Sequence, residues 1–160
     1  MTTGTANVND LSAVYQLTTL IPLFFFARYD HRHHLIRNAA LLAFLPWCLL
    51  SLPISLSGGC PAAERICESL SGFLAGGSLL LIICMATNGG VGGGDIKLVA
   101  LLGIILGMPG ILTLLLLSCL LALLQIAFQD LMYGSHSSRI PFAPSLFTGY
   151  LVLVLFSLSA

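Results

Sequence analysis

The chain has 160 residues, of which 58% are apolar and 8% are charged, and its formal net charge at pH 7 is zero. Soluble domains carry roughly 25% charged and about 45–50% apolar residues, so this composition excludes an ordinary soluble domain. The hydrophobicity excludes a disordered chain, and the scarcity of Lys and Arg argues against a nucleic-acid-binding protein. The composition therefore predicts an all-α integral membrane protein in which residues 1–160 form one domain.

Apolar stretches long enough to cross a bilayer follow one another along the chain. A spanning helix needs about 20 mostly apolar residues, or roughly 17 at the short end. Five stretches meet this length: residues 11–27, 39–57, 70–87, 110–128 and 140–157. A shorter run, residues 98–106, is closed by the helix-breaking segment 107–110. Extended to residues 94–108, it forms a short fourth span, so we expect six transmembrane helices.

The basic residues predict the orientation of these six spans, because cytoplasmic loops collect Lys and Arg. One face holds the loops after spans one, three and five, with five of the six cations: Arg28, Arg32, Arg37, Lys97 and Arg139. The opposite face holds only Arg65. This bias places both termini outside the cytoplasm.

Asp30 and Asp95 are the candidate catalytic residues. Asp30 ends the first span and Asp95 begins the fourth, so both lie near the cytoplasmic surface, and ionisable groups at a membrane are functional candidates. Two neighbouring carboxyl groups share a proton, so one serves as general base toward water and the other as general acid toward a carbonyl oxygen. This chemistry suits peptide hydrolysis. Since 64 residues separate the two aspartates, only their common depth supports the pair.

The segment before Asp95 is rich in glycine, with five glycines among residues 88–97. Glycine removes side-chain bulk, so an extended substrate backbone could lie close to this segment. A helix N-terminus that follows it would favour an anion at Asp95. The local pattern alone is more typical of an N-cap aspartate after a flexible turn.

Three segments, in order, resemble the motifs of one family, the type IV prepilin peptidases. Residues 30–38, Asp-His-Arg-His-His-Leu-Ile-Arg-Asn, resemble its D-x-R-x-x-x-I-P-N motif. Residues 92–97, Gly-Gly-Gly-Asp-Ile-Lys, match its G-x-G-D-x-K motif. Residues 139–144, Arg-Ile-Pro-Phe-Ala-Pro, resemble its late I-P-F-G/A-P element. The resemblance covers nearly the whole chain and agrees with the six-span layout.

The resemblance implies a membrane-embedded aspartyl endopeptidase of the G-x-G-D type in the bacterial inner membrane. Such enzymes cleave the leader peptide of prepilins or pseudopilins on the cytoplasmic side, and they need no metal or other cofactor. The substrate's apolar helix would lie against the spans in the bilayer, while its basic leader reaches the cytoplasmic loops.

The resemblance also assigns roles to single residues. Asp30 and Asp95 would be the catalytic pair. Lys97 would stabilise the active-site loop or one ionisation state, although a lysine that anchors a helix at the membrane surface is an equally ordinary interpretation. The matched loop and positioning residues are Gly92, Gly94, Lys97, Arg32 and Asn38.

Two departures from the family pattern qualify these expectations. Arg37 stands where the I-P-N element has proline. Full-length members also carry an N-terminal domain with paired C-x-x-C motifs that is associated with methyl transfer, and this sequence contains no C-x-x-C pair. We therefore expect leader cleavage without N-methylation, as in the short forms that serve Flp pili of the Tad system.

Three histidines, His31, His33 and His34, follow Asp30 in the sequence. No carboxylate or cysteine cluster completes a recognised ligand spacing, so we expect no metal site there. If Asp30 is catalytic, these histidines could tune its affinity for protons.

Outside the motifs, two further features bear on function. Cys60 and Cys67 flank a short outer loop, where an oxidising compartment would permit a disulfide; two free thiols fit the spacing equally well. Asp130 begins a polar loop, and we expect its carboxylate to be solvated.

The two aspartates leave a second class of function open. A small proton- or cation-coupled transporter could use the same pair, but transporters usually show discontinuous helices at the bilayer midplane or internal repeats. Here the aspartates lie near one surface and no repeat is evident, so a peptidase is favoured. The presence of both aspartates argues against a third class, a catalytically silent assembly factor.

Overall fold

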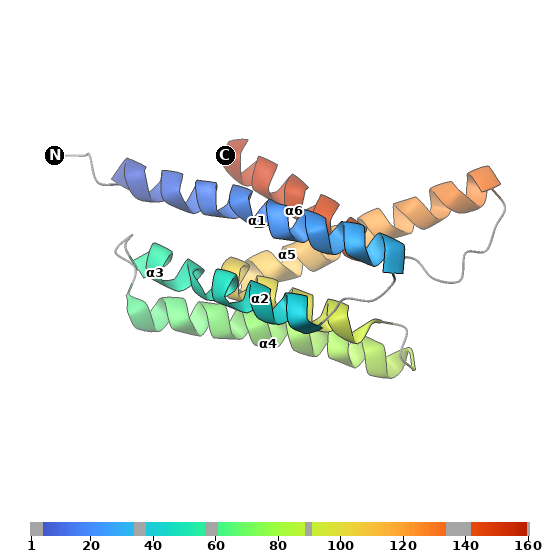
Figure 1. Ribbon diagram of the computed structural model, residues 1–160, viewed down its shortest axis with the longest axis horizontal. Coiled ribbons are helices and arrows are strands. Elements are labelled where there is room, and N and C mark those ends of the chain that lie inside the picture. Colours follow the sequence, from blue (N-terminus) through green and yellow to red (C-terminus); the bar gives the residue numbers. More distant parts are fainter. Residues whose placement is uncertain (1–4, 34–37, 57–60, 89–90, 134–141, 160) are drawn as a thin grey trace.

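Every regular element in the part of the chain that the structure describes is an α-helix (Figure 1). The computed structural model describes residues 5–33, 38–56, 61–88, 91–133 and 142–159. In chain order the helices are α1 (Thr5–His33), α2 (Asn38–Leu49), α3 (Ser51–Leu56), α4 (Ala62–Ala86), α5 (Gly93–Tyr133) and α6 (Phe142–Ser159). The prediction of an all-α chain is confirmed for these residues.

Two short helices, α2 and α3, occupy the stretch where one long helix was expected at residues 39–57. The break falls at Leu50, whose N–H donates to the carbonyl oxygens of Pro46 and Trp47 at 3.1 and 3.2 Å. Pro53 lies one turn further and cannot donate to the carbonyl of Leu49, because proline has no N–H. The missing hydrogen bond explains why α2 ends at Leu49.

Gly107 divides α5 into two helical segments. Its φ of 68° and ψ of −178° are accessible to glycine and strained for other residues. Pro109 follows in the first turn of the second segment, where the lack of an N–H costs no hydrogen bond. In Figure 1 the yellow part of α5 runs toward the left of the view and the orange part runs back to the right. The predicted break at residues 107–110 is confirmed.

α4 and the first segment of α5 pack with their backbones in direct contact. A Cβ atom at Gly72 would lie 2.2 Å from the carbonyl oxygen of Gly103 and 2.6 Å from the carbonyl carbon of Gly107. Small residues at such positions allow membrane helices to approach closely. Near this contact, Arg65 Nη2 donates to the carbonyl oxygen of Ile105 at 3.0 Å, where Gly107 interrupts the helical hydrogen bonds. Gly72 of α4 and Gly103 and Gly107 of α5 therefore form a contact between two helices of the same chain.

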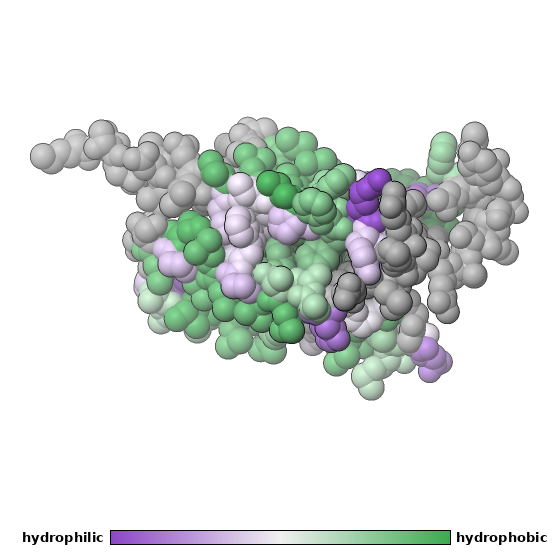
Figure 2. Space-filling model, viewed as in Figure 1, coloured by the Kyte–Doolittle hydropathy of each residue, from purple (hydrophilic) through white to green (hydrophobic). Residues whose placement is uncertain are grey.

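The exterior of the described molecule is mostly apolar. Figure 2 shows green surface over most of the visible face, with the strongest purple toward the end where α1 finishes and α5 begins. Among the described residues, two helices are long and apolar enough to cross a membrane, Ala62–Ala86 and Gly93–Phe128. Because Gly107 breaks the second of these helices, α5 consists of two shorter helical segments. The apolar stretches Asn38–Ile54, which α2 and α3 share, and Phe142–Phe156 in α6 are shorter.

Candidate active site

Asp30 lies in the last turn of α1 with only 6% of its surface exposed. The backbone N–H of Ala143, in the first turn of α6, donates to Asp30 Oδ2 at 3.2 Å. The first N–H groups of a helix have no partner within the helix, and they carry partial positive charge that stabilises an anion. The start of α6 therefore holds the Asp30 carboxylate in place, and this contact joins the first and third sequence motifs.

Asp95 is the third residue of α5. The carbonyl oxygen of Gly92 accepts hydrogen bonds from the N–H groups of Asp95 and Ile96 at 3.0 and 3.3 Å. Gly92 therefore occupies the N-cap position, and the interpretation of Asp95 as the N-cap residue is wrong. The carboxylate folds back toward Gly92, since a Cβ atom there would lie 3.1 Å from Asp95 Oδ2. The absence of a side chain at Gly92 thus makes room for the Asp95 carboxyl group.

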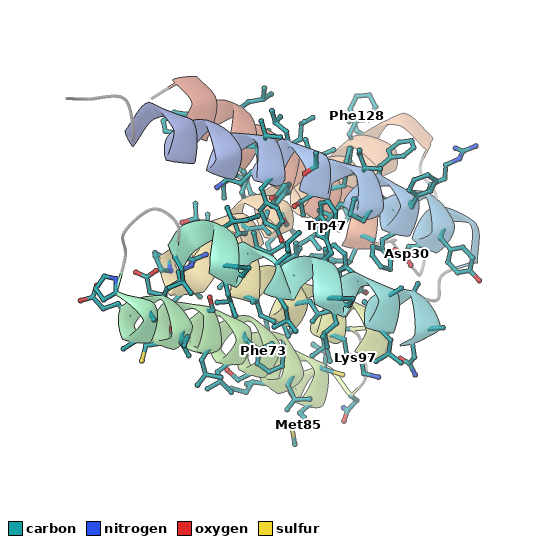
Figure 3. All side chains as sticks on the ribbon, turned by 60° about the vertical axis from the view of Figure 1, so that its left-hand side comes forward. Asp30, Trp47, Phe73, Met85, Lys97 and Phe128 are labelled. Carbon is teal, nitrogen blue, oxygen red and sulfur yellow. The ribbon has the colours of Figure 1, made fainter. Side chains whose placement is uncertain are left out.

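The two aspartates lie at the same end of the helix bundle. Figure 3 shows Asp30 near the end of α1, and Lys97, two residues after Asp95, at the same end. The negative charge of Asp30 exerts a Coulombic repulsion on Asp95. Asp95 Oδ1 is buried and has no hydrogen-bond partner among the described residues. In this arrangement the Asp30 carboxylate is held by a hydrogen bond, whereas one oxygen of Asp95 has no partner among the described residues.

Lys97 binds Asn38, so two of the motif residues contact each other. Lys97 Nζ donates to Asn38 Oδ1 at 2.9 Å, which ties the first turn of α5 to the start of α2. The ion pair found among the described residues does not involve Lys97; it joins Arg65 and Glu68 at 3.2 Å. The Asn38 contact favours a positioning role for Lys97. Sequence reasoning treated the two residues separately and did not predict their contact.

Of the other predicted residues, some lie in the part of the chain that the structure describes and others do not. Gly94 lies half-buried in the first turn of α5, and Cys67 is exposed on α4. The described residues contain no group of three or more His, Cys, Asp or Glu that could hold a metal ion. Several predictions rest on residues or side chains outside the described part of the chain: Arg32, His31, His33, His34, Arg37, Cys60, Asp130 and Arg139. In the structure Cys67 is a free cysteine, in line with the alternative of two free thiols, while Cys60 lies outside the described residues.

A model of the type IV leader peptidase family matches residues 17–127, a range that contains both aspartates and Lys97. The chain belongs to this family. The type IV leader peptidase match stops before α6, so the hydrogen bond from Ala143 to Asp30 extends the site beyond the matched residues.

One curated relative of the chain is named prepilin leader peptidase/N-methyltransferase, from Bacillus subtilis (strain 168). It is 34% identical over 129 residues, which make up 79% of this chain and 49% of the relative. The chain therefore spans about half the length of that relative. No solved structure matches the chain. Membership in the family, together with the long apolar helices, identifies a membrane protein.

Proposed function

We propose that the chain is an aspartyl endopeptidase that removes the leader peptide of prepilins or pseudopilins at the cytoplasmic face of a bacterial inner membrane. The observation that supports this proposal is that Asp30, in the last turn of α1, and Asp95, in the first turn of α5, lie at the same end of the bundle. The family match and the name of the curated relative support the substrate class. Nothing in the comparisons supports the alternative of a proton- or cation-coupled transporter.

The contacts of the two aspartates suggest separate roles in hydrolysis. Asp30 accepts a hydrogen bond from a helix N-terminus, which stabilises its carboxylate form, so we assign it the role of general base. Asp95 would carry the proton, because a charge on its buried and unpartnered Oδ1 would be costly next to Asp30. A water molecule that gives its proton to Asp30 would attack the scissile carbonyl carbon while Asp95 protonates the carbonyl oxygen. As the tetrahedral diol breaks down, protonated Asp30 gives its proton to the leaving amine, the C–N bond breaks, and Asp95 takes back a proton from a diol hydroxyl as the carbonyl group re-forms.

Substitution of each aspartate by asparagine tests this assignment. Asn retains the size of the side chain but can neither accept nor donate the proton as the carboxyl group does. We expect Asp30→Asn and Asp95→Asn each to reduce cleavage of a purified prepilin in proteoliposomes at least about 100-fold. Glu64→Gln is the matched control, because Glu64 is an exposed carboxylate in the first turn of α4. Normal cleavage by either aspartate variant would refute the proposal.

The resemblance of the sequence motifs to the enzymes that serve Flp pili of the Tad system supports a finer substrate class. We propose that the preferred substrate is a prepilin of the Flp type. Side-by-side cleavage of an Flp-type prepilin and a longer type IV prepilin by the same preparation measures this preference. Faster cleavage of the longer prepilin would contradict it.

We also propose that the 160-residue polypeptide cleaves without methylating its product. The paired cysteines that the resemblance associates with methyl transfer do not occur in these 160 residues. Incubation of the polypeptide with cleaved pilin and S-adenosylmethionine, followed by mass measurement of the pilin N-terminus, tests this point. A product heavier by one methyl group would refute it.

A further inference from the structure

An apolar groove runs along the outside of the bundle between α1 and α2. Its volume is about 650 Å³, in the range of about 300–1,000 Å³ that is typical of ligand sites. Aromatic rings between the two helices line it: Phe26 lies edge-on to Phe44 at 5.5 Å, and Trp47 is stacked on Tyr15, which lies outside the groove, at 5.7 Å. Figure 3 shows Trp47 between the two helices. These rings keep α1 and α2 apart and leave the outer side of the groove open.

The two walls of the groove differ in a way that suits a helix. The α1 wall presents large side chains, and Ile21 and Phe25 are 59% and 68% exposed. The α2 wall presents the small exposed residues Ala40 and Ala43. Membrane helices approach one another closely where one of them carries small residues. A third apolar helix could therefore lie against the α2 backbone and pack its side chains on the rings of α1.

The groove ends at the candidate active site. Tyr29, which precedes Asp30 on α1, lines its end. From Thr18 to Tyr29 the wall rises about 17 Å at 1.5 Å per residue, which is long enough for about three turns of a helix. Asp30 does not itself line the groove, but it follows Tyr29 in the last turn of α1. The end of a helix in this groove would therefore lie near Asp30, and the residues just beyond that end would be directed toward the candidate site.

A second groove lies on the other side of α2, between α2, α4 and α5, and has a volume of about 700 Å³. Its end near the active site is lined by Asn38 and Lys97, which are joined by their hydrogen bond. An apolar helix in this groove would have to place its end against a lysine ammonium group and the amide bound to it. The cost of desolvating these groups makes this groove the poorer site for an apolar helix.

We infer that the α1–α2 groove binds the apolar transmembrane helix of the substrate, directly after the bond that is cleaved. This inference rests on the proposed function. Binding in the groove fixes the depth of the helix in the bilayer, so the peptide bond at its end is presented to Asp30 and Asp95. The groove thereby selects substrates by the length and shape of their apolar helix, independently of the leader sequence.

A matched pair of substitutions tests the inference. Ala43→Phe fills the α1–α2 groove, and Ser78→Phe places the same bulk in the second groove; both residues are exposed, so neither change disturbs the core. Each variant is assayed on a complete prepilin and on a short peptide that contains the cleavage site but lacks the helix. For Ala43→Phe we expect KM for the prepilin to rise about tenfold. Its activity on the short peptide and both activities of Ser78→Phe should stay at the level of the unsubstituted protein.

Crosslinking gives a second measurement that does not depend on the variants. A photoreactive residue placed in the apolar helix of the prepilin should crosslink to α1 and α2, and mass spectrometry of the fragments identifies the site. Crosslinks to α4 and α5, or an unchanged KM in Ala43→Phe, would overturn the inference while leaving the peptidase function intact. Failure of the unsubstituted protein to cleave either substrate would instead refute the proposed function.

Discussion

At the scale of single residues, the hydrogen bond between Ala143 and Asp30 is the contact that builds the site. It joins residues 113 positions apart and brings a backbone N–H to a buried carboxylate. Hydrogen bonds to charged groups contribute about 1.5–3 kcal/mol, more than those between neutral groups. The start of α6 is therefore part of the candidate active site, to which it contributes a backbone N–H.

Replacement of Ala143 by proline removes this N–H. Proline is tolerated in the first turn of a helix, so α6 should still form. We expect Ala143→Pro to lower kcat for prepilin cleavage about 10- to 100-fold, because the Asp30 carboxylate loses the N–H that donates to it.

Ala143→Gly is the control for this change, since it retains the N–H. Its kcat should match that of the unsubstituted protein. Equal kcat values for the Pro and Gly variants would show that the N–H does not act on Asp30.

Gly92 offers a test of how closely the Asp95 carboxyl group must be placed. A Cβ atom at residue 92 would lie 3.1 Å from Asp95 Oδ2, so the carboxyl group must shift by a few tenths of an ångström in Gly92→Ala. Small displacements of reacting groups reduce rates strongly, and we expect kcat to fall about tenfold. In the neighbouring Gly93→Ala, the added methyl group meets nothing within 4 Å. The ratio of the two kcat values measures the effect, and a ratio near one would contradict it.

At the scale of helices, the backbone contact of α4 with the first segment of α5 determines where Asp95 lies. Any side chain at Gly72 would meet backbone atoms, which cannot rotate away. We expect Gly72→Ala to lower the free energy of unfolding by about 1–3 kcal/mol, measured by thermal unfolding in detergent. Gly77→Ala on the same helix meets only the Ala100 methyl group, at 3.2 Å, and should cost less. Equal stability of the two variants would contradict this account of the contact.

The positions of the helices could be predicted from the sequence to a large extent, but their packing could not. The apolar runs and the Gly-Met-Pro-Gly breaker at residues 107–110 are local signals, and the structure has helices and a break at these places. The α2–α3 break was missed, although Pro46 and Pro53 stood in the sequence as a signal. In helices that are apolar on nearly every side, no stripe marks the face that packs. The contacts of Asp30 with Ala143 and of Lys97 with Asn38 were therefore not predictable.

At the scale of the whole molecule, the predicted orientation in the membrane can be tested by labelling. Cys67 is exposed near the start of α4, whereas Asn88 is exposed just after the end of that helix, near the candidate site. In cells treated with reductant, we expect a membrane-impermeant maleimide to label Cys67 from outside. This first variant keeps Cys67 as its single cysteine. In a second variant Cys67 is replaced as well, and Asn88→Cys supplies the single cysteine. Labelling of this second variant should require permeabilised cells. The reverse pattern would invert the topology.

The reversal at Gly107 has a consequence for the lipid around the protein. Residues 93–106 rise only about 21 Å at 1.5 Å per residue, whereas the hydrocarbon core of a bilayer is about 30 Å thick. A helical segment shorter than the hydrocarbon core is accommodated when the surrounding bilayer thins or when lipid headgroups move inward at the ends of the helix. Local thinning of the bilayer beside α5 would bring the membrane–water interface to the level of Asp95. The water molecule that the proposed hydrolysis consumes would then reach the carboxyl groups without a channel through the protein.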